Sequence, residues 1–579
     1  MIYNILKTFW QKIFFDKKKS VILVIILITI SSLSEMLTIA TFLPVVNLIL
    51  SPEILDFYII KVFISIFDKF GLKIENNITY YIFGIFIIII LVNTFIKLYI
   101  TYYSQNFIKN TASSIAHKAL SSLFSKNYEQ IISKNSNEIV SALVIKIDEA
   151  INFLIHLLQI VTSSFISVAI IISLFIVDFI VTFYLISIFS IIYGLILFFL
   201  RKRTNKISLI LSENFDTRLK VVQDNITYLR QILLTNNKNF YLNNFVKKDK
   251  NIRKSNLQMY LYSQFPRIAI ETIGIITFSI ITFILLSFMR YDQTYIITIL
   301  AIVIYAFQKL LIAFNQVYVS SINISALKQS TWDIISVIEN NRNSNYQETQ
   351  NLEFKNLKIK NVSFKYKSQE SLIFENLNID INKGDKIGIV GESGSGKSTF
   401  LDIFCGLLNV NQGEILINNI PLHTVKNEWQ NLISYGSQNL FTTEESILEN
   451  IAIGSDKTKV DKKLLLTSCE RSESISFINA LKEKFDTKLG TGGVRLSGGQ
   501  AQRVGLARIF YNNSSVMLFD ESTNSLDNET EKRVIDNIKN YYDDRTILIV
   551  SHNKNILDFC NKIFRFEKGK IKEVSKKSL

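Results

Sequence analysis

The chain has 579 residues, of which 48% are hydrophobic, and it carries a formal net charge of +15. It is too long for one ordinary domain, and apolar content combined with a basic surplus predicts a membrane part joined to a soluble part. The three cysteines form no C-x-x-C pair and the four histidines are scattered, which argues against a disulfide framework or a zinc site.

Six apolar stretches each have about the 20 residues that a helix needs to cross a bilayer. Long polar connections with a helical pattern follow the second and fourth stretches, at 102–152 and 201–266. The third and fourth stretches are separated only by Asp178, and the last two by residues 290–294, so both pairs are expected to form tight hairpins. The predicted spans are 21–50, 80–101, 153–177, 179–200, 267–289 and 295–318.

The location of the basic surplus predicts the orientation of these spans. Residues 201–267 hold 14 Lys or Arg against 4 Asp or Glu. Cytoplasmic connections of membrane proteins carry this kind of excess, and residues 17–19, three lysines before the first span, fit the same rule. We therefore expect both long connections in the cytoplasm, and we expect no nucleic-acid partner.

A further amphipathic segment, residues 51–72, follows the first span. It opens with Ser51, Pro52 and Glu53, which together form a helix-start signal. Apolar residues then form one wide face that polar residues interrupt at near-helical spacing. The pattern is typical of a helix in the outer membrane interface, where it could hold a lipid tail, and equally of a helix packed against the bundle.

The character of the sequence changes after a polar linker at 339–350. Residues 1–338 form the predicted transmembrane domain, and residues 351–579 alternate short β-rich runs with helical patterns. That alternation predicts an α/β domain with a mostly parallel sheet. The clearest β-rich runs are 387–390, 516–519 and 546–550.

Residues 391–398 read G-E-S-G-S-G-K-S and follow the first of these runs. They fit the phosphate-binding loop G-x-x-x-x-G-K-[ST], in which glycines let backbone N–H groups surround phosphates. The lysine reaches the β- and γ-phosphates, and the serine hydroxyl binds Mg²⁺. The residues predicted to contact the nucleotide are Gly391, Glu392, Ser393, Gly394, Ser395, Gly396, Lys397, Ser398 and Thr399.

Asp520 ends the second β-rich run and is expected to hold Mg²⁺ together with Ser398. Residues 496–500, L-S-G-G-Q, lie between the phosphate loop and Asp520. This combination resembles the ATP-binding cassette (ABC) ATPases. The resemblance implies that Ser497, Gly498, Gly499 and Gln500 contact the γ-phosphate of ATP held by a second nucleotide-binding domain.

The same resemblance assigns further roles. Glu521 is expected to orient or deprotonate the attacking water, and His552 to contact the γ-phosphate. Gln438 matches the Q-loop glutamine that touches Mg²⁺ and the membrane domain. Tyr366 matches the aromatic residue that stacks on adenine. Residues 525–527 resemble the D-loop and residues 490–493 the X-loop of exporters.

Six spans ahead of one cassette resemble an ABC exporter half-transporter of the type I architecture: a membrane α-helical bundle fused to an α/β P-loop NTPase cassette. The resemblance implies a homodimer that hydrolyses ATP with Mg²⁺. It also implies a multi-pass protein of the inner (cytoplasmic) membrane, with the nucleotide-binding domain in the cytoplasm. Coupling helices are expected near 127–136 and 235–245.

The cargo prediction depends on charges inside the spans. Glu35, Lys97 and Lys309, with the amphipathic segment, resemble features of the bacterial flippases of lipid-linked oligosaccharides. Charges within a membrane usually face a cavity or a partner, so the lysines could bind a lipid pyrophosphate, or could pair with Glu35. Arg267 is expected at the cytoplasmic entrance of the fifth span.

Other functions stay open at this level. A drug, peptide or lipid A exporter would have the same fold, and an ATP-gated channel or regulator would carry the same motifs. A soluble cassette ATPase acting on DNA or the ribosome is excluded by the six predicted spans. The expected partners are a second copy of the chain, membrane lipids and an amphipathic cargo.

Overall fold

The computed structural model describes residues 2–50, 78–133, 136–288, 293–339, 352–367, 369–438, 440–490, 493–567 and 569–576. The predicted interfacial segment 51–72 and residues 340–350 of the predicted linker lie outside this range, so their predictions stay untested. The chain divides into a helical unit, Met1–Lys126 with Lys134–Arg342, and an α/β unit, Asn127–Ser133 with Asn343–Leu579.

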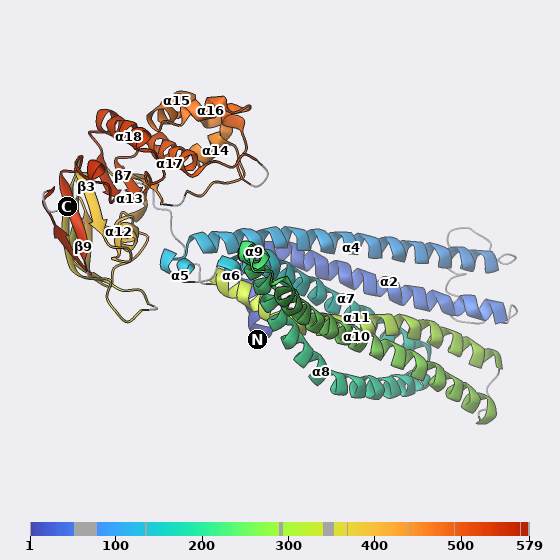
Figure 1. Cartoon of the computed structure of the whole chain (residues 1–579). Helices are drawn as coiled ribbons and strands as arrows, with labels where there is room; N and C mark the ends of the chain where they lie inside the picture. The colour runs from blue at the N-terminus through green and yellow to red at the C-terminus, as the bar shows by residue number, and fades with distance from the viewer. Residues whose placement is uncertain are drawn as a thin grey trace, which may run out of the picture. The chain divides into compact units, whose positions relative to one another are not determined.

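Long helices running side by side make up the helical unit (Figure 1). Helices α7 and α11 form its centre, where Ile170 and Leu174 pack with Ile302 and Ala306. The α-helices of this unit are α1 (Ile2–Phe9), α2 (Lys18–Leu50), α4 (Ile78–Phe124), α6 (Ser136–Ser141), α7 (Ile147–Val177), α8 (Phe179–Thr227), α9 (Leu229–Leu234), α10 (Lys238–Phe288) and α11 (Gln293–Glu339).

Among the described residues, five helices are long and apolar enough to cross a membrane. They agree with five of the six predicted spans. The remaining prediction, 267–289, falls on the last part of α10, which is continuous from Lys238 and is not one of the five. The five apolar segments are Lys18–Val46, Tyr80–Phe124, Ile139–Val177, Thr182–Thr204 and Ile297–Ile338.

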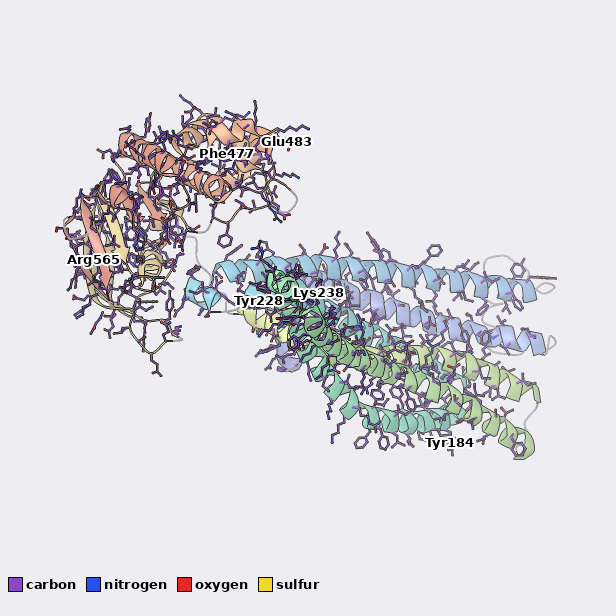
Figure 2. All side chains as sticks on the ribbon, viewed as in Figure 1. Tyr184, Tyr228, Lys238, Phe477, Glu483 and Arg565 are labelled. Carbon is purple, nitrogen blue, oxygen red and sulfur yellow. The ribbon has the colours of Figure 1, made fainter. Side chains whose placement is uncertain are left out.

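Large apolar side chains are exposed along the outer faces of these helices. Phe95 of α4 is 70% exposed and Phe198 of α8 is 78% exposed, and Tyr184 also points outward from α8 (Figure 2). Soluble monomers rarely expose contiguous apolar surface on this scale. The helical unit is therefore suited to a lipid environment.

Two short breaks between helices test the predicted connections. The hairpin at Asp178 is confirmed: this residue is extended, and the Thr182 hydroxyl donates to the Leu174 carbonyl at 2.8 Å across the break. The coupling role expected near 235–245 stays a prediction: this segment follows the short helix α9, which ends at Leu234, and contains the first residues of α10. Asn236 then takes a left-handed conformation (φ 56°), which stops the helix, and α10 begins two residues later.

The α/β unit contains two sheets. The smaller one is antiparallel, in the order β2-β1-β4-β5. The larger one has the order β10-β9-β3-β8-β7-β6 and is parallel except for the β9-β10 hairpin, as predicted. The strands are β1 (Asn356–Phe364), β2 (Phe374–Asn382), β3 (Lys386–Gly391), β4 (Gln412–Ile417), β5 (Ile420–Pro421), β6 (Ile433–Gly436), β7 (Val516–Asp520), β8 (Thr546–Val550), β9 (Lys562–Glu567) and β10 (Lys570–Glu573).

Helices cover both sheets, and their aromatic side chains fill the core. Phe400 and Phe404 of the helix after β3 pack with Trp429, which is fully buried. The helices of this unit are α12 (Lys397–Phe404), α13 (Lys426–Asn431), α14 (Ile447–Ile451), α15 (Lys462–Arg471), α16 (Ile475–Ala480), α17 (Gly498–Asn512), α18 (Asn528–Tyr541) and α19 (Lys554–Leu557).

One short helix from the first long connection, α5 (Tyr128–Ile132), belongs to the α/β unit. It lies within the first predicted coupling segment, 127–136. Tyr128 packs against the core of the unit, and the backbone N–H of Lys367 donates to the Glu129 carboxylate at 3.1 Å. Lys367, which donates this hydrogen bond, directly follows Tyr366.

Candidate nucleotide site and intramembrane ion cluster

Four neighbouring parallel strands bring the predicted catalytic residues to one edge of the larger sheet. Val550 of β8 pairs with Ile389 of β3 on one side and with Asp520 of β7 on the other, and Gly436 of β6 pairs with Phe519. The loops that follow these strands therefore start side by side. In open α/β sheets, ligands bind at this carboxyl edge.

The phosphate loop connects β3 to α12 in a conformation that requires glycine. Gly396, the N-cap of α12, has φ 99°. A Cβ atom at Gly391 would come within 2.6 Å of the Phe566 carbonyl oxygen, so no larger residue fits there. Such a loop points backbone N–H groups at an anion at the helix start, where the helix dipole adds positive potential.

The side chains of the loop suit a phosphate. Lys397 is 9% exposed, and its ammonium group donates to the carbonyl oxygens of Gly391 and Glu392 at 2.6 and 3.0 Å, which holds it over the loop. The Ser395 hydroxyl is buried and has no hydrogen-bond partner among the described residues. It is a donor available to a phosphate oxygen.

Tyr366 lies beside this loop, as the predicted adenine-stacking role requires. Its hydroxyl is 3.2 Å from the Thr399 hydroxyl on α12, and its ring meets Phe364 edge to face. Ser398, the residue before Thr399, is exposed. Tyr366 and the Mg²⁺-binding candidate Ser398 thus flank the same helix start.

Asp520 and Glu521 occupy different environments although they are adjacent. Asp520 is 8% exposed, and its carboxylate accepts a hydrogen bond from the Tyr435 hydroxyl at 3.0 Å. Burial raises the pKa of Asp520, and the charge of Glu521 raises it further, whereas the Tyr435 hydrogen bond opposes the shift. Glu521 has a left-handed backbone (φ 49°) that directs its side chain out of the strand.

Two amide side chains hold the Glu521 carboxylate. Gln438 Nε2 donates to Oε2 at 2.8 Å, and Asn524 Nδ2 donates to the same oxygen at 3.0 Å. Gln438 was predicted as a site residue. Asn524 was missed by the sequence reasoning, and its spacing of three residues from Glu521 in a turn was the only available signal.

Asp402, on the buried side of α12, was also missed. Burial and the nearby charge of Asp520 raise the pKa of Asp402 to about 6. A third carboxyl group therefore lies close enough to Asp520 for their charges to interact, and it is only partly ionised in slightly acidic conditions.

The signature residues form the start of α17. Ser497 is its N-cap: its hydroxyl accepts from the Gln500 N–H at 3.3 Å, and its own N–H donates to Gln500 Oε1 at 2.9 Å. This capping box leaves Gln500 engaged within the helix start. The N-terminus packs on the loop after Glu521, because a Cβ at Gly499 would meet the Ser525 carbonyl at 3.0 Å and Ser525 N–H donates to Gln502 at 2.7 Å.

Three further parts of the predicted site are described: His552, Gly498 and two glycines of the predicted X-loop. His552 is exposed and follows β8 by two residues, so it starts from the same sheet edge. Gly498 faces Ser525 at ordinary contact distance. In the predicted X-loop, 490–493, only Gly490 and Gly493 are described.

The donor set fits Mg²⁺ better than a metal that requires a protein cage. Among the described residues, no group of three or more His, Cys, Asp or Glu side chains is placed to hold a metal ion. Mg²⁺ usually binds one or two carboxylates together with substrate phosphates and waters. The Ser398 hydroxyl, the Gln438 amide and the Asp520 carboxylate are oxygen donors of this kind.

In the helical unit, the three predicted cargo residues form one ion cluster. Glu35 of α2 is 1% exposed, and its two carboxylate oxygens contact Lys97 of α4 at 2.5 Å and Lys309 of α11 at 2.9 Å. Asn93 donates to the same carboxylate at 2.8 Å and accepts from Ser34 at 2.7 Å. The pairing that the sequence left open is therefore present, with both lysines.

The cluster is not neutral and is not closed. Two ammonium groups against one carboxylate give a net charge of +1, and the side chains of Lys97 and Lys309 remain 40% and 31% exposed. Both line a cavity of about 370 Å³. Its other polar lining residues are Thr101, Ser104, Gln105, Gln159, Thr162, Ser163 and Gln316.

Comparison with known proteins identifies this architecture. Residues 374–524 match the ABC transporter family. The chain also superposes over 97% of its length on 96% of a bacterial Atm1-family ABC exporter solved with ATP bound, with a TM-score of 0.80 and 15% sequence identity. The chain therefore has the fold of an ABC exporter. Its matched domain is an ABC ATPase domain, which binds ATP.

Curated relatives are similar in the ATPase domain. The chain is 34% identical over 221 residues to a leukotoxin export ATP-binding protein of Aggregatibacter actinomycetemcomitans, and 33% identical over 218 residues to an ATP-dependent lipid A-core flippase of Pasteurella multocida. These alignments cover 38% of this chain and only 31% and 37% of the two relatives. The similarity therefore concerns the ATPase domain and does not distinguish cargoes.

Proposed function

We propose that two copies of this chain form an ATP-driven exporter of the inner (cytoplasmic) membrane, with the ATPase domains in the cytoplasm. Each chain carries one phosphate loop, on α12, and one signature helix start, on α17. If Ser497 and the glycines after it contact ATP across a dimer interface, one chain alone cannot complete a site. The homodimer requires no further partner and no nucleic acid.

The residues of the sheet edge have separable roles in ATP hydrolysis. Lys397 and the N–H groups of the phosphate loop neutralise phosphate charge, while Ser398, Gln438 and Asp520 supply the oxygen donors for Mg²⁺. Mg²⁺, when bound, stabilises charge on the β- and γ-phosphate oxygens. Glu521 takes the proton of the attacking water, a general-base role for which its carboxylate must be oriented.

The proposed cargo is an anionic amphipathic lipid, such as a lipid-linked oligosaccharide. The observation that carries this proposal is the net positive ion cluster of Glu35, Lys97 and Lys309 on a polar cavity within apolar helices. A lipid phosphate would accept charge-assisted hydrogen bonds from the two ammonium groups, and such bonds strengthen away from bulk water. The polar side chains around the cavity suit a hydroxyl-rich head group.

Charge variants test this proposal without leaving the buried Glu35 carboxylate unpaired. Removing both lysines alone would isolate the Glu35 carboxylate and cost about 3–5 kcal/mol of stability. We therefore compare two combined variants. The double variant Glu35→Gln and Lys97→Gln keeps a net charge of +1, and the triple variant that also carries Lys309→Gln has no net charge. Movement of a lipid-linked saccharide in proteoliposomes should persist in the first variant and fail in the second. Equal transport by both would refute the proposed role of the charge.

Lipid A and toxin exporters remain alternatives of the same fold, because the curated relatives include both kinds. An ATP-gated channel or regulator is the alternative of another class. A channel would dissipate an ion gradient when ATP binds without hydrolysis, whereas the proposed exporter requires turnover. Ion flux measured with the Glu521→Gln variant separates these two functions.

A further inference from the structure

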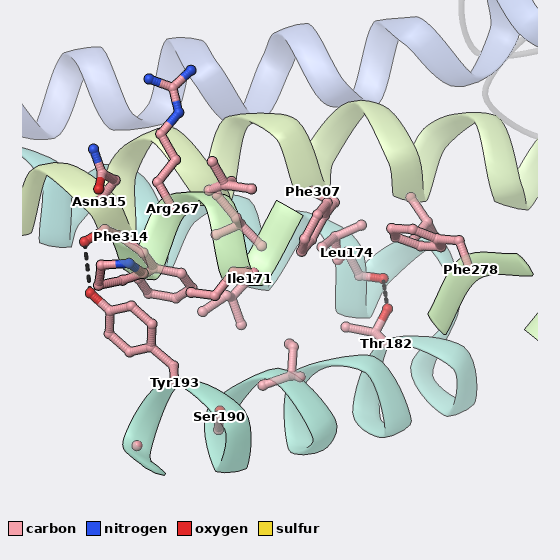
Figure 3. A pocket seen from close by; sticks show the side chains of 17 residues that line it. Ile171, Leu174, Thr182, Ser190, Tyr193, Arg267, Phe278, Phe307, Phe314 and Asn315 are labelled. Carbon is pink, nitrogen blue, oxygen red and sulfur yellow. Dashed lines mark hydrogen bonds between the residues drawn. The ribbon is translucent and has the colours of Figure 1, made fainter. Parts of the chain in front are cut away.

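A second cavity, separate from the ion cluster, lies among α7, α8, α10 and α11 (Figure 3). Its volume is about 260 Å³, and its walls are almost entirely aliphatic and aromatic. Phe278, Phe307 and Phe314 contribute rings, and α8 contributes Tyr193 and Gly194. All four helices belong to one chain, so the cavity does not need a second copy to form.

Two polar side chains that line this cavity, Arg267 and Asn315, lie toward the same end of it, whereas Thr182 lies toward the other end (Figure 3). The Arg267 side chain is exposed, and its guanidinium points away from Tyr193 in the view (Figure 3). The Asn315 Oδ1 atom is buried and accepts no hydrogen bond from the described residues. Two other polar groups of the wall are paired: the Tyr193 hydroxyl donates to the Phe314 carbonyl at 2.9 Å, and the Thr182 hydroxyl donates to the Leu174 carbonyl at 2.8 Å.

An unpaired buried acceptor is unfavourable in an apolar environment, and it indicates a hydroxyl or amide donor that arrives with a ligand. An exposed guanidinium at the same end indicates an anionic group. The apolar volume is smaller than the roughly 300–1,000 Å³ of pockets for drug-sized molecules, which favours a slim chain over a bulky ring system.

We propose that this cavity binds one hydrocarbon chain of an anionic amphipathic lipid, whose polar end lies at Arg267 and Asn315. Lipid tails are as apolar as the cavity wall, so the chain itself gains little by leaving the bilayer. Selection therefore resides at the polar end, where Arg267 binds the anionic group and Asn315 accepts from a hydroxyl. The anionic group of this lipid is held at Arg267 and not at Lys97 and Lys309, which are proposed to bind the cargo, so binding in this cavity does not rest on the proposed function.

Two glycines provide a matched pair of test substitutions. Gly194 lines the cavity, whereas Gly84 on α4 does not, and a Cβ atom added at either position would meet nothing within 4 Å. Gly194→Leu should fill the cavity without a backbone clash, and Gly84→Leu makes the same change elsewhere. Detergent-extracted, full-length protein of both variants should elute as a single species of wild-type size, which controls for folding.

The probe is hexadecyl phosphate with a diazirine group near the end of its chain. After photolysis in proteoliposomes without ATP, mass spectrometry should find adducts on cavity residues of α8 and α11. These adducts should decrease about tenfold in Gly194→Leu and stay unchanged in Gly84→Leu. Equal labelling in all three proteins, or labelling confined to the outer faces of the helices, would overturn the proposal.

The polar end is tested with a neutral probe, hexadecanol carrying the same diazirine. Arg267→Gln should reduce labelling by the phosphate and not by the alcohol, whereas Asn315→Leu should reduce labelling by the alcohol, whose hydroxyl is the donor that Asn315 accepts from. If Arg267→Gln reduced labelling by the phosphate and by the alcohol equally, the assignment of the anionic group to Arg267 would be refuted. Because labelling is measured without ATP, it stands or fails independently of transport: a labelled cavity in a protein that moves no lipid would refute the proposed cargo and leave the binding site.

Discussion

The contact between Asn524 and Glu521 predicts a large kinetic effect from a residue that does not touch the nucleotide in the proposed mechanism. Replacing Asn524 with alanine removes the donor at 3.0 Å from Glu521 Oε2 and leaves Gln438, at 2.8 Å, as the remaining amide partner. The carboxylate then loses one of the two contacts that fix its orientation. The general base should be present but less often correctly placed.

The magnitude follows from the strength of that hydrogen bond. Hydrogen bonds to charged groups contribute roughly 1.5–3 kcal/mol. Asn524 is exposed, so solvent competes and about 1 kcal/mol is a better figure. A loss of about 1 kcal/mol from transition-state stabilisation lowers kcat about fivefold. The KM for ATP should change little, because Glu521 is not needed to bind the nucleotide.

Steady-state ATPase kinetics of the purified dimer provide the assay. Asn524→Asp should be worse than Asn524→Ala, because it removes the donor and places a second negative charge beside Glu521. Since Asn524 and Gln438 share one oxygen, their alanine variants should be non-additive in a double-mutant cycle. Asn528→Ala, also an exposed asparagine, serves as the control. Unchanged kcat in Asn524→Ala, or a change confined to KM, would refute this reasoning.

Three further predictions concern the same unit. Glu521→Gln should abolish steady-state hydrolysis while ATP is still bound and occluded, and retained turnover would exclude Glu521 as the base. Gly391→Ala should weaken ATP binding and destabilise the protein by about 1–3 kcal/mol, because the new Cβ would lie 2.6 Å from the Phe566 carbonyl oxygen; binding titrations and thermal unfolding measure both effects. Asp402→Asn should raise the unfolding temperature above about pH 6. The pKa of Asp402 is raised to about 6 in the fold, so its ionisation lowers stability as the pH rises from about 4 to 6. The gain, about 1–2 kcal/mol after allowance for partial exposure, should decrease toward pH 4, and a gain independent of pH would contradict the assignment.

Most of the nucleotide site could be predicted from the sequence because its motifs end strands. Residues 391–398, Asp520 and His552 each follow a β-rich run, and parallel strands deliver such residues to one edge. The position of each of these residues at the end of its own strand is therefore enough to predict that it lies at this edge of the sheet. Asn524 could not be predicted in this way, because its role depends on the left-handed backbone at Glu521, which nothing in the local sequence dictates.

In the helical unit, the sequence identified which charged residues matter, but it could not predict which of them are in contact. Charges within apolar stretches identified Glu35, Lys97 and Lys309, yet three different helices had to be packed before Glu35 could reach both lysines. The end of α9 was not predictable, because the break before α10 contains a left-handed conformation at Asn236, which several neighbouring asparagines could equally have adopted. The apolar cavity has no sequence signal, since its walls resemble any other apolar surface.

Transport of one lipid pair tests the central claim most directly. Wild-type protein in proteoliposomes should move a lipid-linked saccharide joined through a phosphate or pyrophosphate, in an ATP-dependent manner that Glu521→Gln abolishes. A neutral glycolipid with the same hydrocarbon chain and the same saccharide should move about tenfold more slowly, because it lacks the anionic group that the Lys97 and Lys309 ammonium groups bind. Equal rates for the two lipids, or movement that does not depend on ATP, would contradict the account of an ATP-driven exporter selective for an anionic lipid.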